Sequence, residues 1–511
     1  MGPTLFRARR VIAADGRPSD SLIVSDGVIV FVGQFADAPD TDDVVNVEGV
    51  VLPAFVDAHV HLTDTGLALA GLDLAGARSR RDALDLVASY RPAGGTGVVI
   101  GGGWDESRWP DRRPPTPADL EAAAPGRAIY LARADVHSAV ASPALLAAVP
   151  GIEAMPGWDP SGQVRRDAHH AVRAAAYAAV TPAQRRTAQR RARAHAASVG
   201  VAALHEMGGP QIGGLDDLTG LVALDRDEAG PRIFGYWGAP EGVADAARLG
   251  VGAGGDLSCD GALGSHTAAL AAPYSDRPDT SGHLYLDVDR VAGHVIDATR
   301  ARVQAGFHAI GDRALDTLAD GLAKAASVVG APAIRAMRHR GEHVEMAGPR
   351  VIETFRRLGV VASVQPAFDA TWGGPGGMYV DRLGADRAGT LNPFAAFAAA
   401  GVPLAFGSDA PVTPIDPWAG VRAAVHHRTG RWRLSYQDGL RAATTGGWYA
   451  ARVDGCGELR AGAPATFAAW SAPDQDEAGR PDLDAPAPGC VLTVLEGRPI
   501  YDPGRAISPG A

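Results

Sequence analysis

Short apolar runs, each ending in a polar or acidic residue, recur through the middle of the chain. Between most of them lie Ala- and Arg-rich stretches with helical spacing, such as 181–198 and 291–304. Strands alternating with helices predict a parallel sheet. Eight such runs favour a closed (β/α)8 TIM-type barrel, although an open, doubly wound α/β sheet shares the same alternation. The eight runs are 50–61, 201–206, 232–237, 255–260, 306–311, 337–343, 360–366 and 402–409.

The two ends of the chain show a different pattern, that of short strands separated by turns. Neither end is long enough to form a core alone. We therefore expect a small β-sandwich built from residues 1–51 and 456–511, flanking a barrel at 52–455. The expected terminal strands are 22–24, 28–32, 44–47, 465–470, 491–495 and 498–501.

An insertion is expected between the first two barrel strands. Residues 62–199 are far more than one helical crossover requires. They contain strand-like pieces of their own at 97–103 and 128–135. Because the insertion begins after the carboxyl end of a strand, we expect it to lie over the catalytic face of the barrel.

Composition excludes several classes of protein. The 511 residues are 46% hydrophobic and 21% charged, with a net charge of −10, so there is no basic surface for nucleic acid and no sign of wholesale disorder or multiple membrane spans. Three scattered cysteines form no disulfide framework. We expect a cytoplasmic protein that binds a small molecule and no membrane. Whether it forms a homodimer is left open by the sequence.

Histidines and an aspartate stand at the ends of several expected strands. His59 and His61 end the first one, and side chains two apart in a strand share a face. Alone this pair is equally compatible with two unrelated surface histidines. His308, His343 and Asp409 occupy equivalent positions on later strands. Such nitrogen and oxygen donors suit Zn²⁺, Mn²⁺ or Fe²⁺, and Zn²⁺ is the first expectation, with one or two ions.

These motifs resemble those of a known superfamily. Residues 53–61 (PAFVDAHVH), with His308, His343 and the triplet 407–409 (GSD), resemble the metal-dependent amidohydrolase superfamily. Longer pieces across the whole chain resemble its N-substituted formamide deformylase-like branch, amidohydrolase 3. These pieces are 103–105 (GWD), 135–137 (DVH), 260–265 (DGALGS), 267–268 (TA), 273–274 (PY), 308–312 (HAIGD) and 408–411 (SDAP).

The resemblance implies a role for each strand-end residue. His59 and His61 would bind the buried metal, and His308 and His343 would complete the metal centre or hold the substrate carbonyl. Asp409 would contact the metal and act as the general base towards bound water. A metal ion lowers the pKa of its water and polarises a carbonyl, and an adjacent carboxylate can pass the proton to the leaving nitrogen.

Three residues of the insertion resemble parts of a substrate pocket. Trp104, Asp105 and His137 would line the pocket or a lid over it, and packing within the insertion is the alternative.

One position departs from a pattern common in the superfamily. Many members bridge two metals with a carboxylated lysine on the fourth strand, where this chain has Asp256. Lys324, the only lysine, falls in an expected helix and is a poor substitute. Two hypotheses remain: a one-metal site, or a two-metal site bridged by Asp256. An aspartate side chain is short for contact with two ions. Cys259 has the opposite strand parity to Asp256 and should face the helices.

The expected function is hydrolysis of a carbon–nitrogen bond other than a peptide bond, in an N-substituted amide or formamide. A cyclic amide, carbamate, ester or heterocycle is the alternative substrate. A catalytically silent binding protein derived from such an enzyme is the second class of function. Loss of the lysine favours that class, and retention of the strand-end ligands opposes it.

Overall fold

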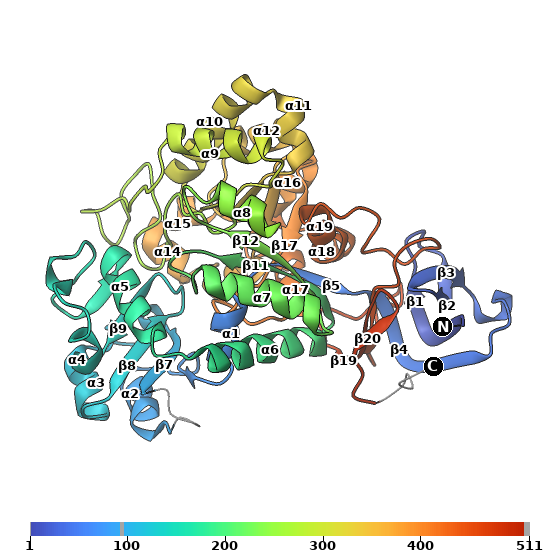
Figure 1. Cartoon of the computed structure of the whole chain (residues 1–511), viewed down its shortest axis with the longest axis horizontal. Coiled ribbons are helices and arrows are strands. Elements are labelled where there is room, and N and C mark those ends of the chain that lie inside the picture. Colours follow the sequence, from blue (N-terminus) through green and yellow to red (C-terminus); the bar gives the residue numbers. More distant parts are fainter. Residues whose placement is uncertain (1, 92–96, 505–511) are drawn as a thin grey trace.

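The computed structural model describes residues 2–91 and 97–504, and its centre consists of two four-stranded sheets, each entirely parallel (Figure 1). Their strand orders are β13-β12-β11-β5 and β14-β15-β16-β17. These strands are buried over most of their length, as expected for parallel strands covered by helices. The strands are β5 (Phe55–Val60), β11 (Val201–Gly208), β12 (Arg232–Trp237), β13 (Gly252–Ala253), β14 (Gly306–Ala309), β15 (Arg340–His343), β16 (Val361–Val364) and β17 (Leu404–Phe406).

Parallel bridges join the two sheets at both edges. Ala253 pairs with Ala305 on one side, and Val60 pairs with Ala410 on the other. Hydrogen bonds support both contacts: Ala253 N–H donates to the Gln304 carbonyl at 2.8 Å, and the amide after Val60 donates to the Ala410 carbonyl at 2.9 Å. The order of the eight strands around both sheets therefore follows their order in the sequence.

The fourth strand differs from its prediction. It covers only Gly252–Ala253, whereas the run 255–260 was expected to be extended. Gly254 and Gly255 have φ values of +129° and +73°, which end the strand. A Cβ on Gly254 would lie 2.0 Å from the Gly306 carbonyl oxygen, so the backbones of the two sheets meet here. The following residues form an irregular segment that carries Asp256.

Helices cover the outside of both sheets. α10 buries residues such as Leu315, Leu318 and Leu322 along one side, which is the spacing of an amphipathic helix. Its only lysine, Lys324, lies on the exposed side and pairs with Asp289 at 2.5 Å. The covering helices are α6 (Pro182–Ser198), α7 (Leu215–Asp227), α8 (Val243–Leu249), α9 (Val288–Arg300), α10 (Asp312–Val329), α11 (Ala331–Met337), α12 (Pro349–Leu358), α16 (Phe394–Ala400), α17 (Pro417–Val425), α18 (Tyr436–Ala443) and α19 (Thr445–Ala450).

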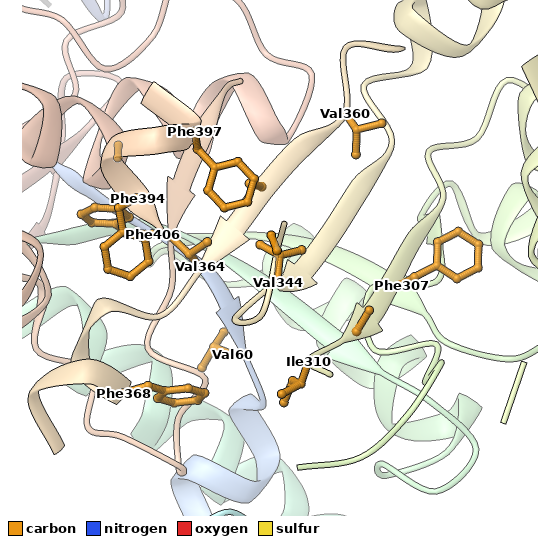
Figure 2. Close-up of a cluster of buried hydrophobic side chains, with 14 of the residues drawn as sticks. Val60, Phe307, Ile310, Val344, Val360, Val364, Phe368, Phe394, Phe397 and Phe406 are labelled. Carbon is orange, nitrogen blue, oxygen red and sulfur yellow. The ribbon is translucent and has the colours of Figure 1, made fainter. Parts of the chain in front are cut away.

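Alternation along the strands directs the candidate ligands inward. Val60, Phe307 and Val344 lie in the hydrophobic cluster around the strands (Figure 2). Because neighbouring side chains of a strand point to opposite faces, His59 and His308 point the other way. The hydrophobic core therefore fixes the direction of these imidazoles.

The two chain ends pair into one sheet, in the region where a small β-sandwich built from both termini was expected. Its order is β20-β19-β18-β4-β1-β2-β3, with β1 parallel to β4 and the other pairs antiparallel. β4 pairs with both ends of the chain, which joins them into a single sheet. The sheet also curls, since Val28 of β3 bridges Pro464 just before β18. The strands are β1 (Thr4–Ile12), β2 (Pro18–Ser25), β3 (Val28–Gly33), β4 (Asp43–Pro53), β18 (Phe467–Ser471), β19 (Gly489–Leu495) and β20 (Arg498–Tyr501).

The segment between β5 and β11 contains a five-stranded sheet of order β10-β9-β8-β7-β6 (Figure 1). It contacts the central part through Asp105, which accepts a hydrogen bond from Trp372 Nε1 at 3.2 Å. Across the described residues, no helix is long and apolar enough to span a membrane. The elements are β6 (Leu72–Asp73), α2 (Arg80–Ser89), β7 (Val98–Trp104), α3 (Pro117–Ala123), β8 (Ala128–Arg133), β9 (Ser138–Ala141), α4 (Pro143–Leu146), β10 (Gln163–Arg165) and α5 (Arg166–Tyr177).

Close packing of α19 on β5 gives a test of the fold. A Cβ on Gly447 would lie 2.4 Å from Val56 Cβ, so Gly447→Ala should destabilise the protein by about 1–3 kcal/mol through overpacking. Gly420→Ala on α17 is the matched control, because no atom lies within 4 Å of its Cβ position. We expect it to stabilise the helix by up to about 1 kcal/mol. Equal urea-unfolding midpoints for the two variants would contradict the packing described.

Candidate metal centre

Six side chains from five strand ends meet in one place. His59 lies on β5, and His61 follows this strand directly. His308 comes from β14 and His343 from β15. Asp409 follows β17, and Asp256 follows β13. The structure thus brings together all the residues that the sequence indicated as metal ligands.

Asp256 lies at the centre of the cluster. Its Oδ1 is 3.4 Å from His308 Nδ1 and 3.5 Å from the Nε2 atoms of both His59 and His343. Its Oδ2 is 3.2 Å from His61 Nε2. The side chain of an aspartate is therefore long enough to reach all four imidazoles at this position.

Asp409 closes the cluster from the end of β17, which lies beside the end of β5. Its Oδ1 lies 3.3 Å from His59 Nε2 and 3.1 Å from His61 Nε2. Both Asp409 Oδ1 and His59 Nε2 are buried atoms without a hydrogen bond. Buried polar atoms are normally satisfied, so this pair indicates a missing partner between them.

The donor set fits a divalent cation. Two groups of three ligand atoms lie within 4.8 Å of one another: His59, His61 and Asp409, and His59, Asp256 and His343. Ligands at about 2.0–2.1 Å from a tetrahedral Zn²⁺ lie about 3.3–3.4 Å apart, which is close to the separations found here. Imidazole and carboxylate donors are those that zinc and similar ions take.

Hydrogen bonds on the far side of the imidazoles fix their orientation. His59 Nδ1 donates to Glu342 Oε2 at 2.9 Å, and His61 Nδ1 donates to the Met207 carbonyl at 2.9 Å. His343 Nδ1 donates to Gln365 Oε1 at 2.8 Å. Each bond leaves the Nε2 lone pair directed at the cluster, as outer partners of metal-binding histidines do.

Glu342 is itself held by a buried guanidinium. Arg340 Nε donates to its Oε1 at 2.8 Å and Arg340 Nη2 donates to its Oε2 at 3.0 Å, and both side chains are fully buried. Sequence reasoning missed these two residues. Their spacing of two in a strand that also ends in His343 was the available signal, because it places both on one face.

The carboxylates and imidazoles of the cluster shift one another's pKa values. Burial lowers the pKa of His61, but Asp256 and Asp409 outweigh it and raise the pKa to about 10. They also raise the pKa of His59 well above its ordinary value, against burial. Burial raises the pKa values of both carboxyls, and the imidazoles overcome this effect and lower them. The site therefore holds ionised carboxylates and requires positive charge beside them.

The position of Asp409 is fixed by its neighbours. Asp57 accepts hydrogen bonds from the Ser408 amide at 2.9 Å and from the Ser408 hydroxyl at 2.5 Å. The Asp409 amide donates to the His59 carbonyl at 2.8 Å. Asp409 has φ +55° and His343 has φ +68°, conformations that non-glycine residues seldom adopt. These turns direct both side chains into the cluster.

A cavity opens beside the cluster, and its wall includes His137. Glu345, which sequence reasoning missed, also lines it. Burial raises the pKa of Glu345 to about 7, and the Tyr379 hydroxyl donates to it. α14 (Met378–Leu383) contributes Met378 and Tyr379 to the wall. Other wall residues are Asp135, Ala262, Leu263, Gly264, Ile310, Phe368, Trp372 and Val412.

The three pocket residues expected on the insertion lie in different places. His137 lines the cavity, whereas Asp105 lines a larger neighbouring cleft. Trp104 lines neither of them. It is fully buried in the hydrophobic core of the insertion, and its indole N–H donates to the Leu131 carbonyl at 2.9 Å. An indole burying its ring and satisfying its N–H in this way is a packing residue.

Comparison with known proteins identifies the class. The family model of the amidohydrolase family matches residues 43–501, and the chain belongs to this family. The protein is therefore a hydrolase of carbon–nitrogen bonds, and its family implies a divalent metal.

Similar proteins occur in plants and bacteria. The chain is 28% identical to Protein LONG AFTER FAR-RED 3 of Arabidopsis thaliana, over 94% of this chain and 88% of that protein. It is 27% identical to Putative amidohydrolase YtcJ of Bacillus subtilis, over 80% of this chain and 81% of that protein.

Two solved structures are similar over most of their length. Both are uncharacterised metal-dependent hydrolases, from Pyrococcus furiosus and Pyrococcus horikoshii, and each has a TM-score of 0.70. They are 24% and 25% identical to this chain, cover 91% of it, and are themselves covered over 98% and 96%.

The bond between Glu342 and His59 gives a test of the metal centre. Glu342→Gln should lower metal affinity about 10- to 100-fold, because an amide orients and polarises the imidazole less well than a carboxylate. Competition with a chelator measures this affinity. Glu206→Gln is the buried control, because the Glu206 carboxyl accepts from the Leu62 amide at 2.7 Å rather than from an imidazole, and burial raises its pKa to about 8. Equal affinities in the two variants would contradict the role of Glu342.

Proposed function

We propose that this protein hydrolyses the carbon–nitrogen bond of a small N-substituted amide or formamide, at a site holding one divalent ion, Zn²⁺ by preference. The observation that carries the proposal is the convergence of the His59 and His61 Nε2 atoms with Asp256 and Asp409 at 3.1–3.5 Å. A purely structural cluster has no reason to leave such atoms unpaired in its centre.

His59, His61 and Asp409 would hold the ion, with Asp256 beside them. His59 belongs to both candidate ligand groups, and its Nδ1 is bonded to Glu342. One remaining nitrogen cannot ligate two ions, which supports a single site. A second ion between Asp256, His308 and His343 is the alternative, and metal stoichiometry separates the two.

When bound, such an ion lowers the pKa of water and polarises a carbonyl. Asp409 is the group that accepts a proton here: its carboxylate stays ionised, since the imidazoles overcome burial and keep its pKa low. It then passes the proton to the leaving nitrogen. His308 and His343, whose rings are 4.4 Å apart at the cavity wall, orient the substrate carbonyl.

The cavity wall supports a partly apolar substrate. Phe368 stacks against His343 with ring centroids 6.1 Å apart, and Trp372 packs edge-on to Phe368 at 5.0 Å. Asp105 bonds to Trp372 and so sets one side of this wall from the insertion. Trp104, the preceding residue, would act only by supporting Asp105. The wall residues contain several aromatic rings, which suit a small organic molecule rather than a peptide chain.

The edge bridges between the two parallel sheets support a further part of the proposal, a single eight-stranded barrel. The residue pairs Ala253–Ala305 and Val60–Ala410 would close it. All the proposed metal ligands then lie at the carboxyl ends of its strands, where barrel enzymes hold their catalytic groups.

Substitution of the proposed base tests the mechanism. Asp409→Asn should lower kcat on N-substituted formamides about 10²- to 10⁴-fold, because an amide accepts no proton. Asp416→Asn is the control from the same loop: Asp416 caps α17 by accepting from the Ala419 amide, which Asn does equally well. Full turnover by Asp409→Asn would exclude the proton-transfer role.

Metal removal tests the proposal as a whole. The protein as purified should contain close to one equivalent of divalent metal, and His59→Ala should lose most of it together with activity. Elemental analysis measures the metal content, and turnover of a panel of formamides, lactams and esters measures the activity. Less than about half an equivalent in the wild-type protein, with no turnover of any acyl substrate, would favour a silent binding protein instead.

A further inference from the structure

His137 enters the cavity of the candidate metal centre from outside the central sheets. It follows β8 of the insertion, and its ring lies 5.2 Å from the ring of His308, centroid to centroid. Its imidazole lines the cavity together with His308, His343 and Asp409. No hydrogen bond to this imidazole is made by any residue in 2–91 or 97–504. Its ring N–H is therefore available to a ligand in the cavity.

The turn that presents His137 has an unfavourable backbone. Val136 has φ +50°, and a β-branched residue in this region is rare. The turn is held by the Val136 amide, which donates to the Arg133 carbonyl at 2.9 Å, and by the His137 amide, which donates to Asp135 Oδ1 at 3.3 Å. Strain of this kind persists only where the surroundings enforce it, and it is common at functional sites.

A buried charge network enforces the turn. The Arg133 guanidinium is fully buried and pairs with Asp105, Glu106 and Asp135 at 2.8–3.0 Å. Ser265, from the segment after β13, donates to Asp135 Oδ2 at 2.7 Å. The insertion and the central part of the protein thus both hold the carboxylate that orients the His137 backbone.

An unprotonated imidazole has one N–H donor. Imidazoles in this state can polarise a carbonyl by hydrogen bonding.

We propose that His137 is a catalytic residue that donates its ring N–H to the substrate carbonyl oxygen, and so stabilises the negative charge that develops there. The inference rests on the proposed acyl hydrolysis at this site. It gives the insertion a part in the chemistry, since the central sheets alone do not supply this donor. Charge on the oxygen increases towards the transition state, so the bond should affect kcat more than KM.

Two substitutions separate donation from shape. His137→Phe keeps a planar ring and removes the donor, and we expect kcat to fall about 10²- to 10³-fold with KM within about threefold of wild type. His137→Asn keeps an N–H donor, and its kcat should be at least tenfold higher than that of His137→Phe. His170→Asn, on α5 of the same insertion, is the control and should retain wild-type kcat. Metal content and unfolding temperature should stay unchanged in all three.

A binding measurement keeps this inference separate from the proposed function. Methylphosphonate carries the charged oxygens that the donor would meet, and its affinity for the metal-loaded protein is measured by calorimetry. We expect at least tenfold weaker binding to His137→Phe and recovery in His137→Asn. If no acyl substrate is turned over, the proposed function fails, and this binding series alone decides the role of His137.

Several results would overturn the role of His137. Wild-type kcat in His137→Phe would exclude the donor, as would equal loss in the Phe and Asn variants. Loss of metal in both variants would show a structural role instead. Methylphosphonate that binds equally to the wild-type protein and His137→Phe, or to neither, would also overturn the inference.

Discussion

Two ionised carboxylates that face the same pair of buried imidazoles impose the main constraint on this structure. Asp256 and Asp409 both lie within 3.5 Å of His59 Nε2, and both approach His61 Nε2. Burying such charges without compensation is very costly. In the protein alone, protons on the imidazoles provide the positive charge, which is why the pKa values of His59 and His61 are raised. A divalent cation satisfies the same demand and leaves the imidazoles neutral.

The fold meets this constraint by fixing each ligand from behind. Arg340 and Glu342 hold His59, and Asp57 holds the turn that presents Asp409 through Ser408. Parallel strands suit this arrangement because their carboxyl ends meet at one edge while their sides stay packed under helices. The insertion adds a further wall through the buried charge of Arg133. Rigid outer contacts of this kind are what keep a reactive site in one geometry.

Local patterns in the sequence predicted most of the strands and the inward direction of the ligands. The run 232–237 coincides with β12, and the alternation around His59 and Val60 gave their opposite directions. The rest depended on contacts between distant segments. The short fourth strand follows from the close approach of Gly254 to Gly306, which no local pattern records. β1 was missed because its polar residues obscure an apolar alternation, and Trp104 turned inward to pack rather than towards the cavity.

Anomalous X-ray diffraction from crystals of the metal-loaded protein, recorded on both sides of the zinc absorption edge, tests the central claim most directly. The account predicts a strong peak enclosed by His59, His61, Asp256 and Asp409, within bonding distance of the two Nε2 atoms. A peak elsewhere on the molecule, or no peak with hydrogen bonds joining those imidazoles to the carboxylates instead, would contradict it.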